Sequence, residues 1–187
     1  MIRTAIPGDY FLIATPVGEC AESVGSIQRS IADALGGEVA EPVHLTLQRF
    51  EISKSTGQAA TLDAIEASIQ GVRPPEVVAA SLFATYHRYF ARHSLRWRVN
   101  PTQDLGRLTV MTAQAIMHQG GKSHWPNADA PIAQFITAAW TNSEQEIPES
   151  FQRFYPQKIM EVCHLEVTRL VAKHQFETVR VFDINRE

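Results

Sequence analysis

Apolar and polar positions along the first part of the chain follow the order strand, helix, strand. Residues 11–16 form a short apolar run closed by a proline, which predicts a buried strand. Apolar residues then recur at helical spacing over residues 19–35, and Gly36-Gly37 follows as a helix stop. Residues 43–50 alternate between apolar and polar side chains, which predicts a half-buried strand.

The same order of elements returns in the middle of the chain. Residues 95–99 alternate as a strand, a helical pattern follows, and that pattern ends at Gly120-Gly121. A second strand is expected over about residues 132–140. The repeated order predicts two halves related by a pseudo-twofold axis.

The segments outside these two copies complete an α+β domain. We expect mostly antiparallel strands in a single domain that spans residues 1–187. The remaining segments are a helix at 61–70, a strand at 77–89, an irregular stretch at 142–155, and a closing hairpin of strands at 158–172 and 175–184.

Charge and cysteine content exclude several classes of function. The 17 basic residues are outnumbered by 20 acidic ones, for a net charge of -3, and this balance argues against a surface for duplex DNA. No apolar run reaches the length of a membrane helix, and no signal-peptide pattern opens the chain. Cys20 and Cys163 form no CxxC pair, so no zinc site or disulfide framework is implied. We expect a cytoplasmic monomer with no membrane contact.

The segment His44-Leu45-Thr46 carries a resemblance to a known family. This His-x-Thr sequence, the apolar strand 95–99 before the second helix, and the closing hairpin resemble the 2H phosphoesterase superfamily. The nearest branch is similar to 2'-5' RNA ligases and RNA 2',3'-cyclic phosphodiesterases. That family is named for two His-x-Thr or His-x-Ser motifs, one in each half of the fold.

The resemblance implies a fold and a reaction. Two lobes would flank a central cleft, with helices packed on the outer faces, and each motif would direct its histidine and hydroxyl into the cleft. Residues i and i+2 of a strand point to the same face, so His44 and Thr46 could contact one phosphate. One imidazole would take a proton from water while the other protonates the leaving 2' oxygen. The hydroxyls would hold the phosphate, and no metal ion or other cofactor is needed.

The second motif departs from the family pattern. Phe135-Ile136-Thr137-Ala138 occupies its place in the order of elements, and a phenylalanine cannot transfer a proton. Two histidines could supply the missing function, and the sequence leaves both open. His164 lies in the closing hairpin and alternates with the apolar Cys163, Leu165 and Val167, whereas His124 lies in the loop before the second motif.

Further residues are candidates for substrate binding. By alternation Gln48 shares a face with Thr46, and Arg98 shares a face with Arg96. The segment 86–107 mixes five arginines with aromatic residues, a composition that suits single-stranded RNA. The alternative is that the aromatic side chains pack in the core while the arginines point to water.

Two functions follow as hypotheses. The first is a metal-independent phosphodiesterase that acts on a 2',3'-cyclic phosphate or a 2'-5' linkage of RNA or a nucleotide. The second is an impaired protein of the same fold, which binds a nucleotide or an RNA end without turning it over, and Phe135 is its main support. In the first, the predicted catalytic residues are His44, Thr46, Thr137 and His164, and the predicted substrate contacts are Gln48 and Arg98.

Overall fold

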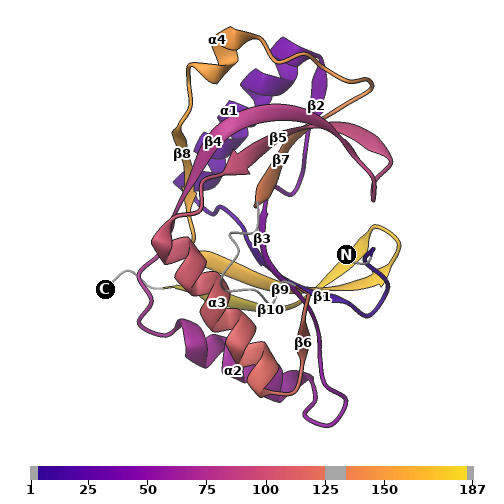
Figure 1. Cartoon of the computed structure of the whole chain (residues 1–187), viewed down its shortest axis with the longest axis vertical. Coiled ribbons are helices and arrows are strands. Elements are labelled where there is room, and N and C mark those ends of the chain that lie inside the picture. Colours follow the sequence, from indigo (N-terminus) through magenta and orange to yellow (C-terminus); the bar gives the residue numbers. More distant parts are fainter. Residues whose placement is uncertain (1–3, 125–133, 185–187) are drawn as a thin grey trace.

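Two curved antiparallel sheets form the body of the protein (Figure 1). The computed structural model describes residues 4–124 and 134–184, and within them each sheet has five strands. Sheet A has the order β10 (Gln175–Asp183), β9 (His164–Ala172), β1 (Tyr10–Ala14), β3 (Leu45–Glu51) and β6 (Lys122–Ser123). Sheet B has the order β2 (Gly37–Val39), β7 (Phe135–Thr141), β5 (Arg92–Val99), β4 (Glu76–His87) and β8 (Gln157–Glu161).

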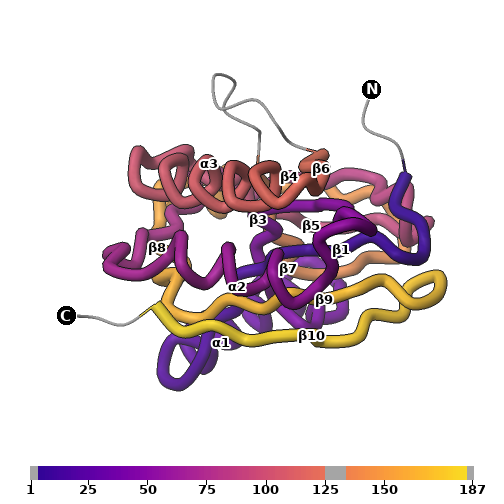
Figure 2. The backbone as a smooth tube through the Cα atoms, turned by 90° about the horizontal axis from the view of Figure 1, so that it is seen from below, coloured from indigo at the N-terminus to yellow at the C-terminus, as the bar shows by residue number. Residues whose placement is uncertain are grey.

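The helices cover the outer faces of the two sheets, so that the sheets flank a central cleft. Helix α1 (Glu19–Leu35) packs against β7 and β8 of sheet B. Helices α2 (Gln58–Ile69) and α3 (Gln103–His118) pack together on sheet A. Figure 2 shows α3 and the β9–β10 hairpin along opposite edges of the molecule, with β1 and β3 between them. A short helix, α4 (Glu149–Gln152), lies against β4.

The repeated order of elements predicted from the sequence is confirmed. The first copy is β1-α1-β2-β3 and the second is β5-α3-β6-β7. Each copy begins and ends in one sheet, while its helix and its short edge strand join the other sheet. The two copies therefore exchange elements between the lobes, as a pseudo-twofold axis requires.

Both Gly-Gly pairs have the same two structural roles: the first glycine ends the helix, and the second allows close contact with a neighbouring strand. Gly36 and Gly120 have positive φ values of 67° and 71°, which turn the chain out of the helix. Gly37 and Gly121 lie so close to the neighbouring strand that an added Cβ would stand 2.9 Å and 2.8 Å from backbone oxygens of β7 and β3, respectively. Only glycine fits there, and this close approach attaches the edge strand to the strand that carries the motif.

The strand register shows which residue of the second motif corresponds to each residue of the first. In sheet A, Thr46 pairs with Ile13, and the next residue of β3 has no partner in β1. In sheet B, Thr137 pairs with Arg96, and again the next residue of β7 has no partner in β5. A β-bulge therefore follows both threonines. Since each motif histidine position lies two residues before its threonine, Phe135 is the structural counterpart of His44.

The closing segment differs from the prediction. Instead of one strand over 158–172, the chain forms β8 in sheet B and β9 in sheet A, and only β9 and β10 form the predicted hairpin. The break lies at Val162 and Cys163, whose backbones bond to Pro75 and Ile184 instead of continuing a ladder. Strands β2 and β6 and helix α4 were also not predicted. None of the helices in the described residues is both long and apolar enough to cross a membrane.

Candidate functional site

His44 stands at the start of β3, where the two lobes meet. Strand β3 of sheet A, which follows His44 directly, has Cα atoms within 8 Å of β7 of sheet B. Nδ1 of His44 lies 2.9 Å from the carbonyl oxygen of Pro42. Because a carbonyl only accepts, Nδ1 must carry the hydrogen, and a neutral ring then leaves Nε2 as a proton acceptor. No residue in the described part of the chain bonds to Nε2.

The surroundings of His44 favour its neutral form. Burial is the largest cause and lowers the pKa of the ring below its ordinary value of 6.5. The bond to Pro42 and the carboxylate of Glu166 act in the opposite direction, and the positive charge of Arg96 lowers the pKa further. At neutral pH the ring is therefore uncharged and suited to act as a base.

Thr46 and Thr137 lie in matching rows of the two sheets. The row in sheet A runs from Thr46 through Ile13 to Glu166, and the row in sheet B runs from Thr137 through Arg96 to Phe83. Both threonines are partly exposed, and neither hydroxyl bonds to another residue within 4–124 and 134–184. Each hydroxyl is thus available to a ligand.

Arg96 is a partly buried cation that forms no ion pair with any residue of the described chain. Its Nε is fully buried and has no hydrogen-bond partner among the described residues, and burial lowers the pKa of its guanidinium. A desolvated and unpaired charge is costly, and a bound anion would compensate for it. Because Arg96 is the cross-strand neighbour of Thr137, the two side chains can contact the same phosphate.

Aromatic rings surround Arg96 on sheet B. Its guanidinium lies 4.9 Å from the ring centre of Phe135, within the range of a cation–π contact. Phe83 meets Phe135 edge-on at 5.2 Å. Arg98 lies 5.6 Å from Phe83 and is exposed, so it is the outer of the two arginines. Where sheet A has an imidazole, sheet B thus has a phenyl ring and a fixed cation.

His164 shares a face with His44 but lies apart from it. It begins β9, and β1 lies between β9 and β3. Its Nδ1 donates to Asp183 at 2.8 Å, and its Nε2 is 3.9 Å from the carboxylate of Glu166. Glu166 in turn accepts a hydrogen bond from the hydroxyl of Thr15 at 2.9 Å. The parity predicted for His164 is correct, but one nitrogen of the ring is already engaged.

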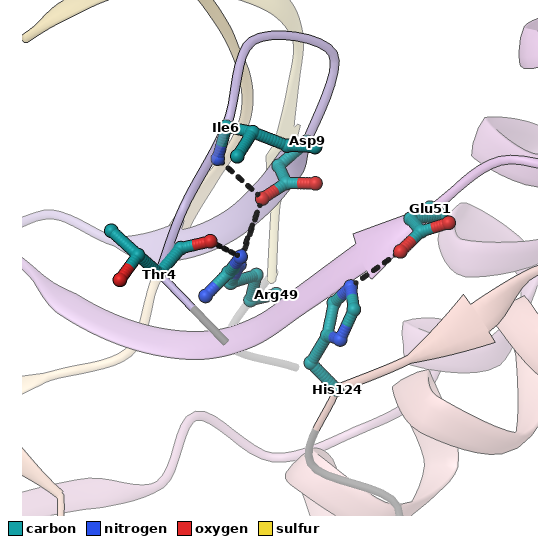
Figure 3. A network of polar contacts seen from close by, with 6 residues as sticks. All are labelled: Thr4, Ile6, Asp9, Arg49, Glu51 and His124. Atoms are coloured by element: carbon teal, nitrogen blue, oxygen red, sulfur yellow. Dashed lines mark hydrogen bonds and ion pairs between the residues drawn. The ribbon is translucent and has the colours of Figure 1, made fainter. Parts of the chain in front are cut away.

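His124 lies in a separate polar network near the far end of β3 (Figure 3). Its Nε2 is 2.9 Å from Glu51, while Arg49 forms an ion pair with Asp9 at 2.7 Å. Polar atoms of Asp9, Glu51 and His124 lie within 4.8 Å of one another, close enough to suggest a metal site. The guanidinium of Arg49 already neutralises Asp9, however, so the arrangement serves better as an ion-pair network than as a cation site.

The structure contradicts the predicted role of Gln48. Its side chain is fully buried, its amide donates to the carbonyl oxygen of Thr109 in α3, and its oxygen accepts from Ser123. The bulge at Leu47 is the reason, because one extra residue shifts the alternation and places Gln48 on the opposite face from Thr46. Gln48 therefore holds helix α3 against sheet A.

Sequence reasoning missed His87 as a candidate. It ends β4 on the same face as Phe83, and its ring contacts Phe90 at 4.9 Å and Trp140 at 5.6 Å. Its Nδ1 is buried without a hydrogen-bond partner in the described part of the chain. The alternation of 83, 85 and 87 was visible in the sequence, but the curvature that brings this end of β4 over the cleft was not.

The hairpin tips connect the two lobes. His174, in the turn between β9 and β10, donates from Nε2 to the carbonyl oxygen of Tyr89 at 2.9 Å, and its ring lies 4.8 Å from Phe90. Tyr89 and Phe90 belong to the turn between β4 and β5. Figure 1 shows the two tips next to each other at the right-hand edge of the molecule.

Comparisons with known proteins agree with this fold. No family model matches the chain, and no curated protein matches its sequence. A crystal structure of TT0787 from Thermus thermophilus matches with a TM-score of 0.62 and 15% identity, covering 94% of this chain and 97% of that one. A phosphoesterase structure matches with a TM-score of 0.53 and 15% identity, covering 97% and 100%.

The chain therefore shares the fold of these solved structures, one of which is a phosphoesterase, and this agrees with the two-lobed α+β fold that the resemblance implied. Among the similar structures is E. coli LigT in its apo form, with a TM-score of 0.53, 13% identity, and coverage of 97% of this chain and 100% of that one. E. coli LigT complexed with 3'-AMP matches with a TM-score of 0.52 and 14% identity, with the same coverage.

Proposed function

We propose that the protein is a phosphodiesterase that hydrolyses a 2',3'-cyclic phosphate or a 2'-5' linkage of RNA or a nucleotide without a metal ion. The observation that supports it is the pairing of a neutral imidazole, His44, with an unpaired cation, Arg96, in one cleft. A base that activates water and a site that stabilises negative charge on the phosphate are two of the elements that hydrolysis of a phosphodiester uses.

In this proposal each group has one role. Nε2 of His44 takes a proton from water as the water oxygen attacks phosphorus, and Nδ1 keeps its hydrogen bond to Pro42. The hydroxyls of Thr46 and Thr137 donate to the phosphate oxygens, and Arg96 stabilises the negative charge that grows on them in the transition state. Such fixed donors need no reorganisation during the reaction, and this is the source of their effect.

A nucleotide is the substrate class that fits these surroundings. Structures of E. coli LigT with 3'-AMP, NADP+ and ATP show a protein of this fold holding nucleotides. In the present chain the phosphate site lies beside Phe83 and Phe135, and the exposed Arg98 can contact the next part of a longer substrate. Aromatic and guanidinium groups are typical surfaces for unpaired bases.

The test is turnover of 2',3'-cyclic nucleotides by the wild type and by His44→Gln. We expect hydrolysis by the wild type, and a loss of about 10²–10⁴-fold in the variant, because a positioned proton acceptor is removed. His118→Gln, at the exposed end of α3, is the matched control and should behave as wild type. Equal activity of His44→Gln and wild type would refute the catalytic assignment. Micromolar binding without any turnover would instead support a binding protein.

A further inference from the structure

We propose that His87 is the second proton-transfer residue, which donates a proton to the leaving oxygen in place of the imidazole that Phe135 has replaced. This inference rests on the proposed phosphodiesterase function. It concerns the half of the reaction that His44 cannot perform, because one base cannot take a proton from water and supply one to the leaving group in the same step.

The position of His87 supports this role. Between Phe83 and His87, strand β4 pairs regularly with β5, so both side chains and Arg96 point to the same concave face. The ring contacts of His87 with Trp140 place it over the end of β7, on the same side as Thr137. His87 also interacts electrostatically with both Arg96 and His44, which lie on opposite lobes. His87 and Arg96 thus share a face of sheet B, and His87 is close enough to both Arg96 and His44 for their charges to affect its pKa.

An unsatisfied nitrogen points to a missing partner. Buried polar atoms in native proteins nearly always have a hydrogen-bond partner, and an exception calls for an explanation. Within 4–124 and 134–184, the buried side-chain atoms without a partner are Nδ1 of His87, Nε of Arg96 and Nδ1 of His93. Two of these atoms, on His87 and Arg96, belong to side chains on the same face of sheet B. A bound phosphate ester could provide the hydrogen-bond partner that each of them lacks.

The charges around His87 change when an anion binds. In the free protein the pKa of His87 is lowered to about 4, mainly by burial and then by the positive charge of Arg96, with smaller contributions from His174 and His44, while a hydrogen bond with its own backbone raises it. Arg96 faces it from β5, His174 from the β9–β10 turn, and His44 from the start of β3. A phosphate beside Arg96 neutralises that charge and adds a negative one, so the pKa of His87 rises on binding. The ring can then take up a solvent proton together with the substrate.

The step balances with these groups. The water oxygen forms the new P–O bond while His44 takes its proton, and the bond from phosphorus to the ribose oxygen breaks with its electron pair on that oxygen. The imidazolium of His87 gives the ribose oxygen its proton and becomes neutral. His44 then releases one proton to solvent, which equals the one that His87 took up.

The experiment separates proton donation from packing by varying the leaving group. Turnover is measured for a 2',3'-cyclic nucleotide, whose alkoxide leaving group needs a proton, and for thymidine 3'-(4-nitrophenyl phosphate), whose nitrophenolate does not. We expect His87→Gln to lose about 10²–10⁴-fold on the cyclic substrate and to retain wild-type activity on the aryl ester. His87→Asn serves as a second variant, and thermal unfolding verifies that each variant is folded.

Two controls sharpen the result. His93→Gln removes another unpartnered nitrogen from the neighbouring strand, but its ring contacts Tyr86, which is exposed on the outer face, so it should behave as wild type. His164→Gln tests the alternative predicted from the sequence. Equal losses of His87→Gln on both substrates, wild-type activity on both, or a selective loss in His164→Gln would each overturn the assignment. If the wild type hydrolyses neither of the two substrates, the proposed function itself is refuted.

Discussion

The two halves of the cleft share a scaffold and differ in chemistry. Each has a motif strand with a bulge after its threonine, an edge strand attached by Gly-Gly, and a helix on the opposite lobe. Sheet A keeps His44, whereas sheet B has Phe135 with Arg96 beside it, where sheet A has Ile13. One half thus offers a proton acceptor and the other a permanent cation.

This difference shows which parts of a repeated site are interchangeable. In the proposed mechanism each threonine hydroxyl contacts the phosphate from its own side, whereas the two proton transfers have opposite directions and need not come from equivalent positions. A guanidinium keeps its proton at any pH at which the protein is folded. Arg96 can therefore stabilise charge without replacing the proton donor, and a donor has to come from another element of sheet B.

The largest effect among tests of this comparison is expected for Arg96→Met. Removing a fixed donor to the transition state should lower kcat by about 10²–10³-fold, while the free energy of unfolding should not fall, because an unpaired and partly buried charge is replaced by an apolar chain. Steady-state kinetics and urea unfolding measure the two quantities. Arg98→Met, on the exposed arginine of the same face, is the control and should change kcat by less than about tenfold. A smaller loss for Arg96→Met than for Arg98→Met would contradict the phosphate site.

Replacing each threonine by valine tests the symmetry of the phosphate site. Each substitution removes a hydrogen bond to a charged group, worth about 1.5–3 kcal/mol, so Thr46→Val and Thr137→Val should each lower kcat/KM by roughly 10- to 150-fold. Comparable losses mean that both halves hold the phosphate. If only Thr46→Val loses activity, sheet B contributes the cation alone, and the two hydroxyls are not equivalent.

The glycines test the shared scaffold. Gly37→Ala and Gly121→Ala place a Cβ within 2.9 Å of neighbouring atoms, so each should lower the free energy of unfolding by about 1–3 kcal/mol. Gly106→Ala is the matched control, because it lies inside α3 with open space around it and should stabilise the protein by about 1 kcal/mol. Urea unfolding of the three variants measures these changes. A neutral effect of either strained substitution would show that the two attachments are not alike.

The relation between the halves also predicts a rescue. Phe135 occupies the position equivalent to His44, so an imidazole introduced there should reach the phosphate from the side of sheet B. In a His87→Gln background, Phe135→His should recover roughly tenfold in kcat on a cyclic nucleotide, a part of the effect of a well-positioned proton donor. Phe135→Leu in the same background is the control and should recover nothing. Equal activity of the two double variants would mean that the equivalence does not extend to the side chains.

Much of the fold could be predicted from the sequence because local patterns determine it. The helix over 19–35 has the predicted bounds, and the Gly-Gly pairs revealed the repeat. The site is a harder problem, since it depends on single-residue shifts and on curvature. A bulge at Leu47 turned Gln48 away from the cleft, and the bend of β4 brought His87 over it. Neither the bulge nor the bend can be recognised from the order of apolar and polar residues in the sequence.

The smallest expected effect is the pH dependence of stability, which compares the histidines of the two lobes. His44 and His87 both have pKa values lowered in the fold, that of His87 to about 4. Between that value and 6.5 the unfolded chain binds more protons than the folded one, so their contribution is complete above pH 6.5 and is lost as the pH falls toward 4.

A difference of one in pKa corresponds to about 1.4 kcal/mol, and solvent screening reduces this for a partly exposed ring. We therefore expect His87→Gln to remove about 1 kcal/mol of the acid-induced loss, as measured by urea unfolding at pH 7 and at pH 4.5, and His44→Gln to act in the same direction. If the loss were unchanged in both variants, the imidazoles would titrate alike in the folded and unfolded states, and the desolvated surroundings inferred for both rings would be absent. If it decreased only in His44→Gln, the desolvated histidine would belong to sheet A alone, and the proton donor of sheet B would have to be sought elsewhere.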